Sequence, residues 1–143
     1  MVPENVTVVQ GTRQQGGLPM KLAIPSESGR GLAAQRSGHF GHCAWFTIVT
    51  IEDGQVAAVE SVRNVDHDAA GCGGVIDFVI SLGVDAILTA GMGRPPLTRF
   101  TQAGVVVYVE SQSPLVSQAV QRFLAGQVGV MSLDMACNHH HQA

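Results

Sequence analysis

The sequence is poor in charge: Lys, Arg, Asp and Glu make up 13% of its 143 residues, and the net charge is −3. It contains no group of basic residues that would follow a phosphate backbone, which argues against a nucleic-acid partner. It also contains no apolar run of the ~20 residues that a membrane-spanning helix requires, and no basic segment followed by an apolar one near Met1. We therefore expect a cytoplasmic protein that binds neither nucleic acid nor membranes.

Several catalytic signatures are missing as well. The sequence has neither a Gly-x-Ser-x-Gly nucleophile elbow nor a phosphate-binding Gly-x-x-x-x-Gly-Lys-Ser/Thr loop. Its carboxylates are scattered, and no acidic pair follows successive expected strands, as two-metal phosphoryl chemistry would require. These absences favour a protein that is not an enzyme.

The chain has only three cysteines, Cys43, Cys72 and Cys137, and they lie far apart. An odd number at such spacing suits reduced thiols better than a disulfide framework. Each thiol is a candidate ligand for a soft metal, or simply a small core residue. Spacing alone does not decide between these two roles.

The composition that is present indicates a globular chain with one core: 45% of the residues are hydrophobic, and 17 are glycine. A length of 143 residues fits one domain. The segment before Met20 has a linker-like composition, so we expect a flexible N-terminal extension over 1–19. The domain is then expected over 20–128, followed by a C-terminal tail with a Cys/His cluster over 129–143.

Apolar periodicity predicts five strands and three helices. The strands are expected at 21–25, 45–51, 55–62, 85–90 and 105–110. The helices are expected from near Cys72 to Gly83, from Pro95 to Gly104, and from Ser113 to near Gly126. An Asp-Gly turn joins the second and third strands into a hairpin. This order predicts an α/β fold, in which an antiparallel β-β-β meander followed by αβαβα forms a five-stranded mixed sheet with helices on its faces.

The densest polar group of the sequence is Ser37-Gly38-His39-Phe40-Gly41-His42-Cys43, in the loop before the second expected strand. It places two imidazoles and a thiol within five residues. Imidazole suits copper, zinc and iron, and thiolate selects soft ions and sulfur-bridged clusters. The group lacks the Cys-x-x-Cys spacing of a closed zinc site, so it predicts part of a soft-metal site.

Two further loops carry groups that could bind an anion. The segment His67–Gly74 places a histidine and Cys72 just ahead of a helix, where free N–H groups attract anions and acidify thiols; a capped loop with a half-buried cysteine is the alternative. The segment Gly91-Met92-Gly93-Arg94-Pro95 follows the fourth expected strand, at the edge where open α/β sheets bind ligands. Arg94 is expected to pair with an anion or to lie in solvent.

The tail holds a fourth group, Cys137-Asn138-His139-His140-His141, which concentrates four candidate ligands in five residues. This composition favours metal binding if another part of the chain folds over it. A frayed end is the alternative.

In their order along the chain, Met20–Pro25, Ser37–Gly41, Asn64–Gly73 and Gly91–Gly93 resemble the NifX/NafY-like family of iron-molybdenum cofactor biosynthesis. The similarity extends over about 20–127, and the His39-Phe40-Gly41 element is its most specific part. The residues Ser37–Cys43 are most similar to those of the branch that contains the orange protein of sulfate-reducing bacteria. The resemblance implies a ribonuclease-H-like three-layer fold and a protein that binds or hands over a molybdenum-copper sulfide cluster or a related molybdenum-iron-sulfur cluster.

Such a cluster is a sulfide-rich anion, so its binding requires N–H donors, positive charge and an apolar wall. The expected binding residues are Arg36, Ser37, Gly38, His39, Phe40, Gly41, His42, Cys43, His67, Gly71, Cys72, Gly73, Gly91, Met92, Gly93 and Arg94. The expected direct metal ligands are His39, His42 and Cys72, with Cys137, His139, His140 and His141 as weaker candidates.

The leading hypothesis is therefore non-enzymatic carriage of a molybdenum-containing metal-sulfur cluster, with a protein that donates or accepts the cluster as a partner. A second hypothesis is a thiol- or metal-dependent enzyme that uses Cys72 or Cys43 as nucleophile and His67 or His42 as base. A third is a protein-interaction module in which these loops only shape a surface.

Overall fold

The computed structural model describes residues 19–132, with the backbone alone for residues 67–72. The expected extension, apart from Pro19, and most of the expected tail lie outside the described residues. The described elements are β1 (Met20–Ser26), the 3-10 helix η1 (Gly31–Ala33), β2 (Trp45–Glu52), β3 (Gln55–Arg63), α1 (His67–Ser81), β4 (Ala86–Thr89), α2 (Arg94–Gln102), β5 (Val106–Val109), α3 (Val116–Leu124) and β6 (Gly129–Val130). None of the helices in this part of the chain has the length and apolar character needed to cross a membrane.

The strands form one mixed sheet in the order β3-β2-β1-β4-β5-β6. β1, β2 and β3 pair antiparallel, β1, β4 and β5 pair parallel, and β6 is antiparallel to β5. The α/β class and the meander are therefore confirmed. The predicted count of five strands is wrong, because Gly129 and Val130 add a sixth strand too short for an alternating pattern to reveal. The sheet thus continues past the expected domain boundary at 128.

The hairpin between β2 and β3 turns where it was predicted. Asp53 and Gly54 both have positive φ, 55° and 76°, as the two central residues of a type I′ turn require. Gly54 adopts this conformation without strain, and Asp is among the residues that tolerate it best. This turn pairs Glu52 with Gln55, and a register shift between Thr50 and Ile51 then moves the pairing by one residue, so that Trp45 pairs with Arg63 at the far end of the hairpin.

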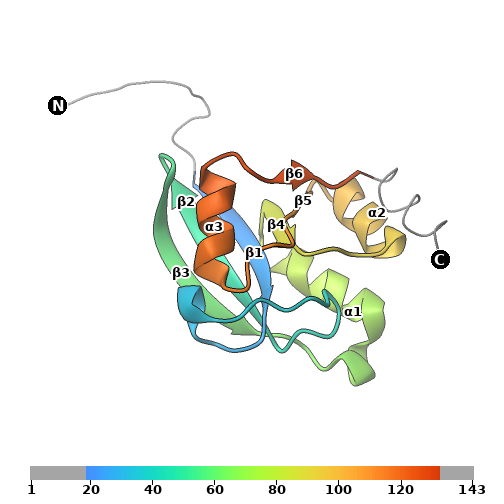
Figure 1. The fold of residues 1–143 in the computed structure, drawn as a ribbon. Coiled ribbons are helices and arrows are strands. Elements are labelled where there is room, and N and C mark those ends of the chain that lie inside the picture. Colours follow the sequence, from blue (N-terminus) through green and yellow to red (C-terminus); the bar gives the residue numbers. More distant parts are fainter. Residues whose placement is uncertain (1–18, 133–143) are drawn as a thin grey trace.

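Side chains alternate between the two faces of the sheet, as the pleat dictates. In β1, Ala23 packs with residues of α1 and α2, whereas Leu22 and Ile24 pack with residues of α3. Figure 1 shows α3 on one side of the sheet and α1 and α2 on the other. The result is three layers with an apolar core on each face.

Helix α1 begins at His67, before the predicted start near Cys72, so the predicted loop over the following residues is wrong. Glycines at 71, 73 and 74 misled the prediction, because each disfavours a helix by about 1 kcal/mol relative to alanine. The burial of Val75 and Val79 against the sheet outweighs this penalty. Only Asn64, Val65 and Asp66 separate β3 from the helix.

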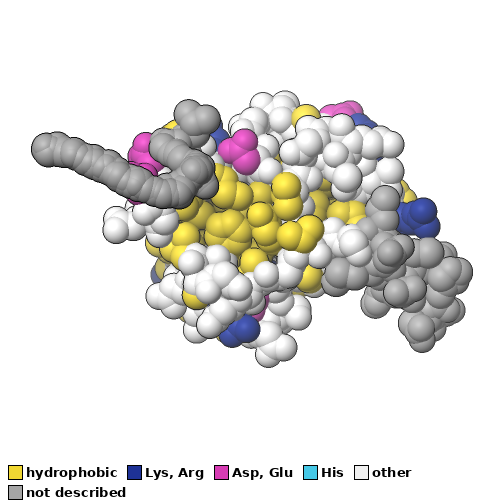
Figure 2. Space-filling model, turned by 90° about the horizontal axis from the view of Figure 1, so that it is seen from above, with side chains coloured by type: hydrophobic (Ala, Val, Ile, Leu, Met, Phe, Trp, Pro, Cys, Tyr) yellow, Lys and Arg dark blue, Asp and Glu magenta, His cyan; other side chains and the backbone are white. Residues whose placement is uncertain are grey.

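β1 and β5 begin at one end of the sheet, and β6, which pairs with the last two residues of β5, runs towards that end. Figure 2, which views the molecule from above, shows hydrophobic side chains gathered on this end. A shallow apolar groove there is lined by residues that include Thr101, Val105, Val106, Val130 and Met131. The candidate ligands described below lie at the opposite end.

Candidate functional site

The carboxyl ends of β1 and β4 lie side by side, because these two strands are parallel neighbours. β3 runs in the same direction as β1 and ends at the same edge, so α1 begins there; the loop after β4 leads into α2 from this edge as well. Open α/β sheets bind ligands at this edge. The topology therefore brings together the three loops that the sequence singled out within the described residues.

The loop Arg36–Cys43, called the site loop below, is fixed at its start by backbone hydrogen bonds. Ser37 N donates to Pro25 O at 3.0 Å, and Arg36 forms an isolated bridge with Ser26 of β1. The buried Ser37 hydroxyl accepts a hydrogen bond from His39 N and donates one to His39 O, each at 3.2 Å. The backbone of His39 is thus held by the residue two positions before it.

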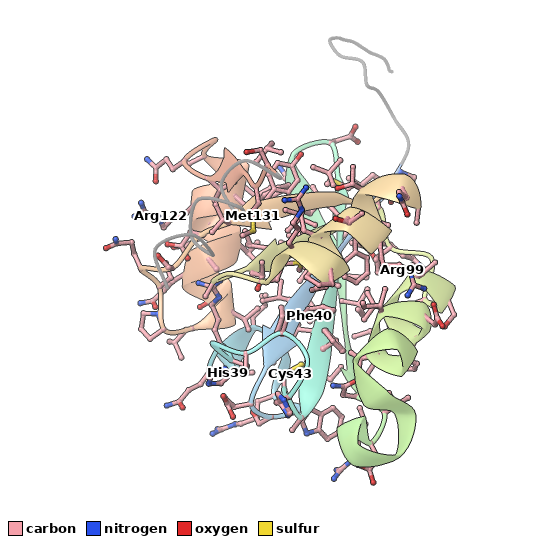
Figure 3. The ribbon with its side chains drawn as sticks, turned by 90° about the vertical axis from the view of Figure 1, so that its right-hand side faces the viewer. His39, Phe40, Cys43, Arg99, Arg122 and Met131 are labelled. Carbon is pink, nitrogen blue, oxygen red and sulfur yellow. The ribbon has the colours of Figure 1, made fainter. Side chains whose placement is uncertain are left out.

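Phe40 anchors the middle of the site loop in the core between the sheet and helices α1 and α2. Its side chain is 5% exposed, and its ring lies 5.8 Å from that of Phe46 and 5.3 Å from that of Phe100, edge-on to the latter. Figure 3 shows Phe40 inside the molecule and His39 at its edge. Gly38, His39 and His42 are exposed, so the loop buries its aromatic residue and presents both imidazoles.

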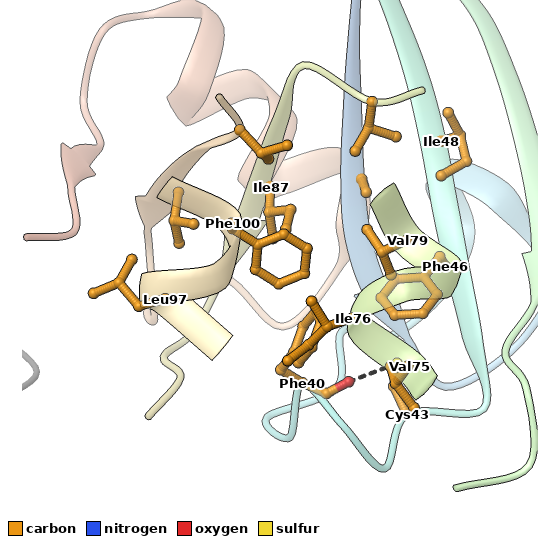
Figure 4. Packing of buried hydrophobic residues seen from close by; sticks show 14 residues of the cluster. Phe40, Cys43, Phe46, Ile48, Val75, Ile76, Val79, Ile87, Leu97 and Phe100 are labelled. Carbon is orange, nitrogen blue, oxygen red and sulfur yellow. Dashed lines mark hydrogen bonds between the residues drawn. The ribbon is translucent and has the colours of Figure 1, made fainter. Parts of the chain in front are cut away.

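Cys43 closes the site loop as a buried residue, and its Sγ donates to Phe40 O at 3.3 Å (Figure 4). Burial raises the pKa of this thiol to about 12. The thiol is therefore protonated at neutral pH, whereas nucleophiles and metal ligands require the thiolate. The structure gives Cys43 a packing role and does not favour it as the nucleophile of an enzyme.

Asn64 fixes the end of the site loop, a role that sequence patterns did not reveal. Its Nδ2 donates to Cys43 O at 2.8 Å, and its backbone N donates to Ala44 O at 3.0 Å. Its Oδ1 is buried and has no hydrogen-bond partner among the described residues. The only sequence signal was the place of Asn64 in the ordered family motifs.

Arg36 was expected to meet the charge of an anion, but its guanidinium is engaged inside the protein. Nη1 donates to Glu110 Oε1 at 2.5 Å and to Ser113 O at 3.1 Å, and Nη2 donates to Glu110 O at 2.6 Å. The Arg36 side chain is 5% exposed. The positive charge of Arg36 therefore pairs with the carboxylate of Glu110 and is not exposed to solvent at the site edge.

The loop after β4 is shaped by the buried Thr89. Its Oγ1 donates to Gly91 O at 3.0 Å and accepts from Gly91 N at 3.2 Å, while Met92 is half-buried against the core. Gly93 and Arg94 are exposed. Because Pro95 and Pro96 have no N–H group, the first turn of α2 supplies few donors, and Arg94 is the cation that this loop offers to an anion.

The remaining predicted residues are placed less fully. His67, Gly71 and Cys72 lie in the first turns of α1, at the site edge, with their backbones alone described, and Gly73 follows them as an exposed helical residue. The weaker candidates Cys137, His139, His140 and His141 lie outside the described residues.

The described part of the chain brings no three His, Cys, Asp or Glu side chains together in an arrangement that could hold a metal ion. It does offer open backbone. A Cβ atom added at Gly38 or Gly91 would meet no described atom within 4 Å, and neither glycine has the positive φ that demands glycine. Neither the packing nor the backbone conformation therefore requires glycine at these two positions. Because no described atom occupies the space beside them, an external group could lie directly against the backbone there.

These features define an α/β protein with an exposed, glycine-containing loop edge. The chain belongs to the Dinitrogenase iron-molybdenum cofactor family, which it matches over residues 20–126. The resemblance stated from the sequence is thereby confirmed.

Individual relatives agree with this assignment. The chain is 30% identical over 113 residues to an uncharacterised protein of Methanocaldococcus jannaschii, with 76% of this chain and 89% of that protein covered. It resembles the apo form of the orange protein from Desulfovibrio gigas with a TM-score of 0.67 at 27% identity, covering 82% of this chain and 97% of the other. A candidate NifB protein from Thermotoga gives 0.63 at 29% identity, with 78% and 92% covered.

Proposed function

We propose that this protein binds and carries a molybdenum-containing metal-sulfur cluster as cargo, at the edge formed by the site loop and the loop Gly91–Arg94. The observation that carries the proposal is the exposed pair Gly38-His39 on a loop whose start, middle and end are buried or hydrogen-bonded. Family membership and the likeness to the orange protein support cargo of this kind.

The chemistry of the edge suits a sulfide-rich anion better than a bare metal ion. A bare ion requires three or four converging side chains, whereas a cluster whose metals already carry sulfide ligands leaves fewer coordination positions for the protein to fill. In our proposal His39 supplies a ligand, with His42 beside it on the loop. Backbone at Gly38 and Gly91 lies against the sulfide surface, and Arg94 contributes charge.

The metals of the cargo are proposed as molybdenum with copper, by likeness to the orange protein, with a molybdenum-iron-sulfur cluster as the related choice. We further infer a ribonuclease-H-like fold, which the central sheet order β3-β2-β1-β4-β5 supports. A carrier must also receive and release its cargo, so a donor or acceptor protein is part of the proposal.

The test uses substitutions that the fold tolerates and the cargo does not. Gly38→Ala and Gly91→Ala add a methyl group in open space, and Gly129→Ala on β6 is the matched control, because its Cβ would meet only Val109 Cγ1 at 4.0 Å. Each protein is incubated with tetrathiomolybdate and copper, passed through gel filtration, and measured by visible absorption and metal analysis.

We expect the wild type and Gly129→Ala to retain molybdenum and copper in a fixed ratio. Gly38→Ala and Gly91→Ala should melt at or above the wild-type temperature, because alanine restricts the unfolded chain, and yet retain less cargo. Wild-type protein that takes up no metal would refute the proposal. Full retention by both alanine variants would refute the placement of the cargo at this edge.

A further inference from the structure

Glu110 is a buried carboxylate directly after β5. Its side chain is 2% exposed. It accepts hydrogen bonds from Ser113 Oγ at 3.1 Å, Gln112 N at 3.2 Å and Ser113 N at 3.4 Å, in addition to the bond from Arg36. A buried carboxylate with this many donors is held in one position.

The partner of this carboxylate, Arg36, is the first residue of the site loop. Two guanidinium nitrogens bind the Glu110 carboxylate and the Glu110 backbone carbonyl, at 2.5 and 2.6 Å. The planar fork of arginine fixes direction as well as distance, which a lysine ammonium does not do. The end of β5 and the start of the site loop are therefore held in one geometry.

Backbone contacts connect the same two segments. Arg36 N donates to Pro114 O at 2.8 Å, and Val116 N donates to Ala34 O at 3.0 Å. Gln35 and Leu115 also form an isolated antiparallel β-bridge. Beyond Arg36, the next residue is Ser37, whose hydroxyl holds His39 at both its N–H and its carbonyl. A continuous series of contacts therefore runs from Glu110 through Arg36 and Ser37 to His39.

From this series we propose that Glu110 and Arg36 are positioning residues of the cargo site: their ion pair fixes the site loop so that His39 is presented in one orientation. The inference rests on the proposed function. It assigns to Arg36 a role inside the protein in place of direct contact with the cargo. Residues that orient a metal ligand from behind commonly change metal affinity by about 10-fold to 100-fold when they are lost.

The test compares two substitutions around the same carboxylate. Glu110→Gln keeps the shape of the side chain and removes the charge that holds Arg36. Arg122→Gln is the matched control. Arg122 Nε of α3 lies 3.1 Å from Glu110 Oε2 without aligned hydrogen-bond geometry, its side chain is 42% exposed, and it faces the carboxylate oxygen to which Arg36 does not donate. Arg36→Lys keeps the charge without the fork and serves as the second variant if Glu110→Gln does not fold.

A loss of global stability must be separated from a loss of positioning. Val120→Ala, on the buried face of α3, weakens the core between α3 and the sheet and leaves both residues of the ion pair in place. Two quantities are measured: the rate at which the molybdenum-copper cargo is lost from loaded protein, and the hydrogen exchange of the His39 amide in cargo-free protein, relative to that of Val79 in α1.

We expect Glu110→Gln and Arg36→Lys to lose cargo about 10-fold faster than wild type or more, and to exchange the His39 amide faster while Val79 is unchanged. Arg122→Gln and Val120→Ala should keep wild-type values for both quantities relative to Val79. If cargo loss follows the melting temperature equally in all four variants, or if His39 exchange is unchanged in Glu110→Gln, the positioning role is refuted while the proposed function stands. A wild type that takes up no cargo refutes both.

Discussion

Replacing Phe40 with alanine should test the anchoring of the site loop most directly. The ring is 5% exposed and pairs with Phe46 and Phe100. Removing a buried phenylalanine costs about 3–5 kcal/mol, which includes the cavity that is left behind. At roughly 4 °C per kcal/mol for a domain of this size, the melting temperature should fall by roughly 12–20 °C. Phe40→Leu, which keeps most of the volume, should cost less than about 1.5 kcal/mol.

The same change should affect cargo separately from stability. Phe123→Ala is the control, because Phe123 pairs edge-on with Tyr108 at 5.0 Å on the opposite face of the sheet, away from the site loop. At a temperature where all variants are folded, Phe40→Ala should release the molybdenum-copper cargo faster than wild type, and Phe123→Ala should not. Thermal melts and metal retention after gel filtration measure the two effects. A Phe40→Ala protein with wild-type stability, or with wild-type retention despite its lower melting temperature, would contradict the anchoring role.

Three other predictions concern groups at and away from the loop. Cys43, with its pKa raised to about 12, should resist alkylation by iodoacetamide at pH 8 in folded protein, and rapid labelling of the native protein would contradict its burial. The free energy of unfolding should also fall as the pH rises from about 9 towards 12, because the folded state keeps the thiol proton to a higher pH than the unfolded state does. For Glu110, burial alone would raise the pKa, but the Ser113 and Gln112 donors and the Arg36 charge lower it below the ordinary value, so its stabilisation is present above about pH 4.3 and is lost as the pH falls through the lower folded value. Glu110→Gln should flatten that acid dependence in chemical denaturation, and equal slopes would argue against the lowered pKa. A chain ending at Ser132 should retain cargo, because β6 runs antiparallel to β5, away from the edge that holds the site loop; loss of retention would favour Cys137 and the tail histidines as ligands.

The sheet could be predicted from the sequence largely because its signals are local. A run of β-branched and aromatic residues in Trp45–Glu52 and an Asp-Gly turn whose residues take positive φ specify a hairpin without help from distant contacts. The start of α1 and the strand β6 were missed for the complementary reason. Glycines weaken the local helix signal ahead of Val75, and Gly129-Val130 is a strand only because β5 lies beside it. In both cases tertiary packing decides against local propensity.

The candidate site shows the same limit more sharply. Sequence patterns predicted the site loop and placed Arg36, His39 and Cys43 among its binding residues, with His39 as a direct ligand and with a core role for Cys43 left open. Arg36 meets Glu110 across 74 positions of sequence, and Cys43 meets Asn64 across 21. Such pairings depend on the folded topology, so composition and spacing could not reveal that two of the three residues are used inside the protein and only His39 is exposed.

Under the proposed function, this division of roles follows from what a loop must do to hold a large anionic cargo. An exposed loop that orders only on binding loses about 1–2 kcal/mol of backbone entropy per residue from its affinity. In this protein the loop backbone is already ordered by folding, because three of its residues are fixed inside the molecule. The Arg36 guanidinium pairs with Glu110, the Phe40 ring packs in the core, and the Cys43 carbonyl accepts a hydrogen bond from Asn64. Gly38 and His39 then remain exposed on a backbone that is already fixed. In the proposed function, these three anchored residues allow His39, His42 and the bare glycine backbone to suffice at the surface.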